Sequence, residues 1–243
     1  MTKSVVELLD TYAKAFRDLV NERLSGGKKS ATELLRLNKK DDWGFICTSM
    51  HIVGDASTAI RNFLQFGIDG PTKYQDIGER YLRLYGVLNA TYIQQQAIIK
   101  LYKLMNVPDP NDAKKKIEAL RITEVRHKVG AHSVNYQNSN TSSIESFVPV
   151  RVSLSGFNCD YINNESLIIE HVDLKCCLEK HLTLMVDILD KIYEKAVKTL
   201  YKLNKNKIEE LNQKLQNLRI EREGGVVMDF PDGGKLIIHT MRQ

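Results

Sequence analysis

The densest group of reactive side chains lies in residues 123–132, where two histidines, an arginine and a lysine fall within seven positions. Ile122, Val125 and Val129 recur at helical spacing, which predicts an amphipathic helix with a buried apolar stripe. In an ideal helix, Arg126 and His132 would point about 120° apart. We therefore expect Gly130 to end or distort the last turn, so that the two side chains can meet over one phosphate.

An arginine and a histidine that share a site are suited to phosphodiester cleavage without a metal. Histidine can take the proton of a ribose 2′-hydroxyl, and the planar guanidinium can hold the phosphate and stabilise the charge that develops on it. The competing interpretation is structural. A basic helix end that carries a histidine also complements the negative end of the helix dipole as a solvated surface.

Arg126-x5-His132, with the polar His127 directly after the arginine, resembles the Arg-x(4 to 6)-His signature of the HEPN superfamily. The second position of that signature is commonly Asn, Asp or His. The motif lies late in a helical chain, after two long predicted helices and before another, and the resemblance covers roughly residues 44 to 205.

The resemblance implies an up-and-down helical bundle, homodimerisation and metal-independent RNA cleavage, in which Arg126, His132 and His127 would be catalytic. It also implies a cytoplasmic role in a toxin–antitoxin or phage-defence system, with RNA or a nucleotide as ligand and a protein partner such as an antitoxin. Many relatives bind without cutting, so a non-catalytic binding or adaptor module is the alternative. Some relatives that a nucleotidyltransferase controls carry a tyrosine two residues after the histidine, where this chain has Val134.

Further lysines offer contacts to an RNA backbone. Lys128 lies inside the motif, and Lys114, Lys115 and Lys116 form a basic run before it. We expect these four residues to bind substrate if they share a face with Arg126. The alternative for the run is a solvated helix face.

Composition sets the outer bounds of these hypotheses. The chain has 243 residues, of which 42% are apolar and 27% charged, enough for one sizeable core. Its net charge of +5 is compatible with binding to a polyanion but is too small to predict such binding by itself. The sequence has no run of eighteen apolar residues and no CxxC pair, so we expect a cytoplasmic protein that has no membrane span, disulfide framework, metal or cofactor.

Apolar periodicity predicts the elements that must position the motif. Helices are expected at residues 4–24, 43–66 and 73–105, and a long helix capped by Asp173 resumes after Asn204. Pro108 and Pro110 break the chain between the third helix and the motif. The residues 94–96 are all glutamine and are expected to form an exposed turn of the third helix.

Two β elements complete the expected fold. Alternating residues near 145–170 predict a small insertion with Pro149 on an edge strand, and the last twenty residues predict strand, turn and strand. We therefore expect a mainly α protein with four to five main helices, divided into a bundle at 1–222 and a hairpin tail at 223–243. Cys177 and His181 are four residues apart and could face one metal, but we favour a structural role for both.

Overall fold

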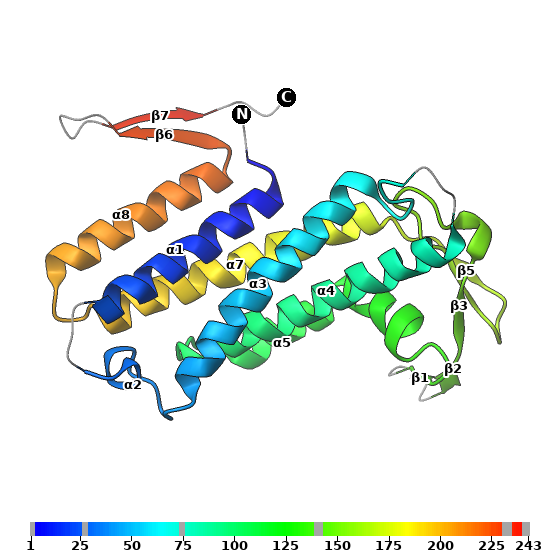
Figure 1. Ribbon diagram of the computed structural model, residues 1–243, viewed down its shortest axis with the longest axis horizontal. Helices are drawn as coiled ribbons and strands as arrows, with labels where there is room; N and C mark the ends of the chain where they lie inside the picture. The colour runs from blue at the N-terminus through cyan, green and yellow to red at the C-terminus, as the bar shows by residue number, and fades with distance from the viewer. Residues whose placement is uncertain (1–2, 26–28, 73–75, 139–142, 230–234, 240–243) are drawn as a thin grey trace. The chain divides into compact units, whose positions relative to one another are not determined.

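The computed structural model describes residues 3–25, 29–72, 76–138, 143–229 and 235–239 (Figure 1). Five long helices supply most of the structure: α1 (Val5–Ser25), α3 (Asp42–Phe66), α4 (Ile77–Leu104), α7 (Leu174–Leu200) and α8 (Lys205–Arg222). The predicted class, mainly α with a small β insertion and a C-terminal hairpin, is confirmed within these residues.

The shorter elements lie between the long helices. The helices are α2 (Ala31–Leu34), α5 (Pro110–Glu118), α6 (Arg121–Val125), the π-helix η1 (Arg126–Ala131) and the 3₁₀ turn η2 (Arg151–Ser153). The strands are β1 (Tyr136–Gln137), β2 (Ile144–Glu145), β3 (Phe147–Pro149), β4 (Tyr161–Asn163), β5 (Ile169–Glu170), β6 (Gly225–Asp229) and β7 (Lys235–His239).

Side-chain caps fix the start of several helices at the predicted places. Asp173 Oδ1 accepts hydrogen bonds from the backbone N–H groups of Lys175 and Cys176, at 2.9 and 3.2 Å, so α7 begins where expected. The Asn204 side chain accepts from Lys207 N at 3.0 Å and starts α8 as a helix separate from α7. These local bonds satisfy backbone groups that a helix end leaves without partners.

The chain divides into two compact units. The terminal unit comprises Met1–His51, Ala97–Pro110 and Thr183–Gln243, and the central unit comprises Ile52–Gln96 and Asn111–Leu182. The candidate catalytic residues all belong to the central unit.

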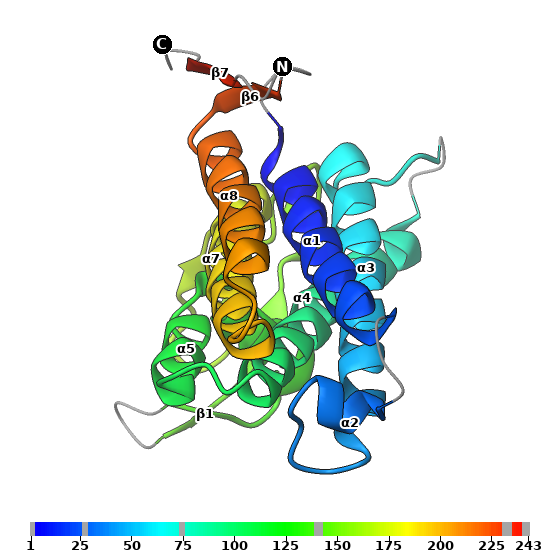
Figure 2. The same cartoon turned by 90° about the vertical axis from the view of Figure 1, so that its left-hand side faces the viewer.

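In the terminal unit, α8 lies beside α1, and the β6–β7 hairpin follows the end of α8 (Figures 1 and 2). Asp190 of α7 joins these helices, because its carboxylate accepts from Tyr12 of α1 at 3.1 Å and from Arg219 of α8 at 2.9 and 2.6 Å. Burial and the nearby Asp190 carboxylate raise the pKa of the Tyr12 phenol, so it stays a donor. The buried carboxylate is therefore fully paired.

A buried chain of polar side chains runs through the central unit. Gln94 and Gln95 of α4 are 0 and 2% exposed, so the prediction of an exposed glutamine turn is wrong for these two residues. Gln94 donates to Ser57 Oγ at 3.1 Å and accepts from His181 Nε2 at 2.8 Å, and Gln95 donates to Thr123 Oγ1 at 3.1 Å. The amide groups thus tie α4 to α3, α6 and α7. Burial without these partners would be costly.

The predicted β insertion is confirmed as small antiparallel pairs within the central unit. Strands β3, β4 and β5 form one sheet in that order, which places Pro149 on an edge strand as expected. Phe147 N donates to Ser133 O at 2.7 Å, so β3 starts beside the residue that follows His132. Among the helices that the structure describes, none combines the length and apolarity needed to span a bilayer.

Candidate active site around a π-helix

The motif helix changes its hydrogen-bonding pattern at Arg126. Residues Arg126–Ala131 form a π-helix, and His132 N donates to His127 O at 2.8 Å across five residues instead of four. This pattern widens the turn, and such turns often occur at functional sites. The distortion expected at Gly130 is therefore present, and it extends over the whole interval between Arg126 and His132.

The π-helix brings the two histidine rings together. The centroids of His127 and His132 are 5.6 Å apart, with the rings meeting edge to face at 62°. His132 is exposed and His127 is half-buried. Burial lowers the pKa of His127, and the nearby Arg126 and His132 lower it further. The carboxylate of Glu118 acts in the opposite direction but does not cancel this effect. His127 is therefore mainly neutral at neutral pH.

Arg126 rests on an aromatic ring instead of pairing with an acid. Its guanidinium carbon lies 3.7 Å from the centroid of the Tyr92 ring, on α4. Within the described residues, no carboxylate forms a salt bridge with Arg126. Stacking on an aromatic face orients the planar guanidinium and leaves its N–H groups available to an anion.

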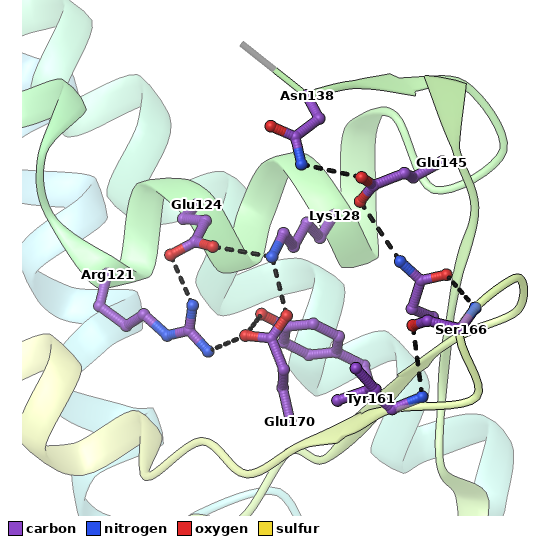
Figure 3. A network of polar contacts seen from close by, with 10 residues as sticks. Arg121, Glu124, Lys128, Asn138, Glu145, Tyr161, Ser166 and Glu170 are labelled. Carbon is purple, nitrogen blue, oxygen red and sulfur yellow. Dashed lines mark hydrogen bonds and ion pairs between the residues drawn. The ribbon is translucent and has the colours of Figure 1, made fainter. Parts of the chain in front are cut away.

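The other two cations of this region are neutralised by carboxylates (Figure 3). Lys128 Nζ lies 2.8 Å from both Glu124 Oε1 and Glu170 Oε1, and Arg121 bridges the same two acids at 2.5 Å each. Tyr161 donates its hydroxyl hydrogen to Glu170 at 2.8 Å. Burial alone would raise the pKa of Glu170, but hydrogen bonds from Lys128, Arg121 and Tyr161 outweigh it and lower the pKa to about 2.

Lys128 is expected from the sequence to bind substrate, but it lies inside the protein. The residue is 8% exposed, and its ammonium lies 5.6, 4.8 and 5.5 Å from the ring centroids of Tyr136, Phe147 and Tyr161. These rings come from β1, β3 and β4. Lys128 thus anchors the β insertion to the π-helix and takes no part in the substrate contacts that we propose.

The lysine run lies on the exposed side of α5. Lys114, Lys115 and Lys116 are exposed, and Ala113 and Ile117 form the buried stripe of the same helix. Lys114 pairs with Glu118 at 3.4 Å and Lys116 with Asp112 at 2.8 Å. The Glu118 charge at the end of α5 acts on His127. These lysines remain candidates for backbone phosphate contacts.

The sequence did not reveal the partners of Arg126 and Lys128, which stack the first on the Tyr92 ring and pair the second with the Glu170 carboxylate. Tyr92 is 34 residues before Arg126, and Glu170 is 42 residues after Lys128. The only signal for Tyr92 is its helical spacing with Tyr81 and Tyr85, which the sequence shares with ordinary core positions.

His181 is held by amides. Its Nε2 donates to Gln94, and its Nδ1 lies 3.4 Å from the Gln95 amide nitrogen. Burial lowers the pKa of His181 to about 3, which keeps the ring neutral. The predicted structural role of His181 fits these bonds. Within the described part of the chain, no three His, Cys, Asp or Glu side chains are grouped as metal ligands would be.

Comparison of the chain with models of protein families, with curated proteins and with solved structures finds no match. The functional assignment therefore depends on the geometry around the π-helix and on the Arg126-x5-His132 resemblance.

Proposed function

We propose that this protein is a metal-independent endoribonuclease of HEPN type that works in the cytoplasm as a homodimer. The observation that carries the proposal is the state of Arg126. Of the three cations Arg121, Arg126 and Lys128, only Arg126 lacks a carboxylate partner among the described residues, and it lies next to the histidine pair. An oriented cation beside two imidazoles suits a phosphodiester better than it suits a structural role.

The proposed reaction uses the ribose as nucleophile. The exposed His132 accepts the proton of the 2′-hydroxyl, the 2′-oxygen attacks phosphorus, and the bond from phosphorus to the 5′-oxygen breaks. The 5′-oxygen leaves with a proton from the imidazolium of His132, which carries the proton taken from the 2′-hydroxyl, and the neutral His127 beside it shares in this transfer. Arg126 binds the phosphate and stabilises its added charge. The products carry a 2′,3′-cyclic phosphate and a 5′-hydroxyl.

The second candidate function is a non-catalytic module that binds RNA or a nucleotide, or that joins a protein partner. The same unpaired Arg126 favours it, because an oriented guanidinium binds phosphate whether or not a base is in place. The two functions differ in what the histidines do.

The test measures both cutting and binding for Arg126→Ala and His132→Ala. For the endoribonuclease, His132→Ala should slow cleavage roughly a hundredfold or more and leave RNA affinity nearly unchanged. Arg126→Ala should reduce both. His171→Ala removes an exposed histidine of the same unit and is the matched control. All variants must keep the wild-type melting temperature.

Binding that depends on Arg126 without any cleavage by the wild type would select the binding module. Cleavage by a folded His132→Ala variant at the wild-type rate would remove His132 from the mechanism. For the assembly, light scattering should give twice the chain mass of 27.8 kDa, and a monomer at micromolar concentration would contradict the proposed dimer.

A further inference from the structure

One face of α4 carries tyrosines at Tyr81, Tyr85 and Tyr92, with Leu88 between the last two. A helix turns about 100° per residue, so Tyr81 and Tyr92 differ by about 20° in direction and Tyr85 lies within about 40° of both. These side chains therefore form a single stripe along the helix. Arg126 rests on the Tyr92 end of that stripe.

The π-helix runs along this stripe toward Tyr85. Arg126 lies over Tyr92, and a Cβ built on Gly130 would meet Leu88 Cδ1 at 3.9 Å. As the chain advances from residue 126 to residue 130, its contact on α4 moves four residues toward the N-terminus. Tyr85 is the next position of the stripe, about 4.5 Å along the axis beyond Leu88. It thus lies beyond the Gly130 end of the π-helix, the end that leads to His132.

Tyr85 presents an aromatic surface that the protein covers only in part, although burial and the nearby Tyr81 and Cys159 raise the pKa of its phenol. The residue is 44% exposed, and its ring is stacked with that of Tyr81 at 5.9 Å and 23°. Its neighbours Gly86 and Asn89 are also exposed, and a Cβ built on Gly86 would meet nothing within 4 Å. A planar ligand can therefore reach the surface of α4 at this point.

Proteins that bind single-stranded nucleic acid commonly combine exposed aromatic side chains with a nearby cation. Every unpaired base has a face that can stack on an aromatic ring, whereas the bases of a duplex are covered by their neighbours. The axial rise from Tyr92 to Tyr85 is about 10.5 Å, close to the length of three stacked nucleotides at about 3.4 Å each. One strand could therefore contact both Arg126 and Tyr85.

We propose that Tyr85, backed by Tyr81, is a stacking platform for an unpaired base near the phosphate held by Arg126, and that the substrate is single-stranded RNA. The inference rests on the proposed function, whose site it extends. Tyr92 orients Arg126, and Tyr85 binds a base on the His132 side. The platform selects single strands by stacking and without regard to base sequence.

The experiment measures binding of a fluorescent RNA with 2′-O-methyl riboses, which has no free 2′-hydroxyl and cannot be cut by the proposed reaction. Tyr85→Leu should weaken the affinity for the single strand roughly 5- to 150-fold, the range found when one base loses the aromatic side chain on which it stacks. Tyr85→Phe keeps the aromatic face and should bind within about twofold of wild type. Leu82→Ala changes a 73% exposed neighbour outside the stripe and is the control.

A duplex of the same sequence should bind more weakly than the single strand and should respond little to Tyr85→Leu. Equal affinity of wild type and Tyr85→Leu for the single strand would overturn the platform. Equal affinity for duplex and single strand would overturn the substrate class.

Failure of this inference is distinguishable from failure of the proposed function, because binding and cutting are measured on different RNAs. If Tyr85→Leu loses affinity and wild type does not cut unmodified RNA, the platform stands and the endoribonuclease falls. If wild type cuts unmodified RNA and Tyr85→Leu binds and cuts as well as wild type, the endoribonuclease stands and the platform falls. Absence of binding to any RNA would overturn both.

Discussion

The Lys128 ammonium lies 2.8 Å from Glu170 Oε1, across 42 residues of sequence, and joins the π-helix to strand β5. Lys128→Met should therefore destabilise the protein by about 2–4 kcal/mol, because Glu124 and Glu170 would lose one of their two shared cations. Urea unfolding measures this loss. Lys115→Met, on the exposed side of α5, should change stability by less than about 0.5 kcal/mol. Equal midpoints for the two variants would mean that the pair contributes nothing.

The same cluster should make stability depend on acid. The pKa of Glu170 is about 2 in the folded protein against an ordinary value of 4.5. Its ionised form therefore contributes stability above pH 4.5, and this contribution is lost as the pH falls from 4.5 toward 2. The stability difference between wild type and Glu170→Gln should be largest near pH 6 and shrink over that interval. A difference that stays constant with pH would contradict the assignment; the exposed Glu165→Gln is the control.

His181 should make the free energy of unfolding depend on pH over a higher range than Glu170 does. Its pKa is about 3 in the folded protein and 6.5 in an ordinary environment, so below pH 6.5 the unfolded chain binds a proton that the folded one does not. Stability should fall by up to about 1.4 kcal/mol per pH unit from 6.5 toward 3. His181→Asn should flatten this slope. Urea midpoints measured from pH 7 to 5 test it, and an unchanged slope in the variant would point to another group.

Tyr92 should matter through its ring and not through its hydroxyl. Tyr92→Leu removes the surface on which Arg126 lies, so kcat/KM for RNA cleavage should fall roughly two- to thirtyfold, the equivalent of about 0.5–2 kcal/mol for a cation on an aromatic face. Tyr92→Phe should restore most of the rate. If both variants lose activity equally, the phenol group and not the stacked guanidinium is responsible.

The proposed chemistry assigns every proton transfer to side chains. Cleavage of unmodified RNA should therefore continue after dialysis against EDTA, at a rate close to that of the untreated protein. Loss of activity that Mg²⁺ or Mn²⁺ restores would remove Arg126 and His132 from the centre of the mechanism and require a metal in their place.

The parts of the fold that could be predicted from sequence are those that interactions between residues close together in the chain determine. Apolar spacing located α1, α3, α4 and α7, Asp173 marked the start of α7, and Pro149 marked an edge strand. The 120° mismatch between Arg126 and His132 also predicted a distorted helix, and η1 provides one. Each of these inferences depends on backbone geometry within one or two turns.

What the sequence could not supply are pairings between distant segments. Nothing near Gln94 or Gln95 indicates that His181 and Thr123 will satisfy their amides, so two polar residues were expected at the surface and are buried. Lys128 looks like any basic residue of a motif until Glu170 is placed beside it. The sorting of cations into paired and unpaired is a property of tertiary structure.

A π-turn contains one residue more than the α-turn it replaces, which bears on insertions and deletions in this segment. Removing one of the five residues between Arg126 and His132 would let the helix close with ordinary four-residue bonds, while α6 before it and β1 after it could keep their places. The Arg-to-His spacing would then shorten by one and still match the Arg-x(4 to 6)-His signature. In an α-helix, however, an arginine and a histidine at that shorter spacing would point about 140° apart, so the deletion would keep the fold and separate the two side chains.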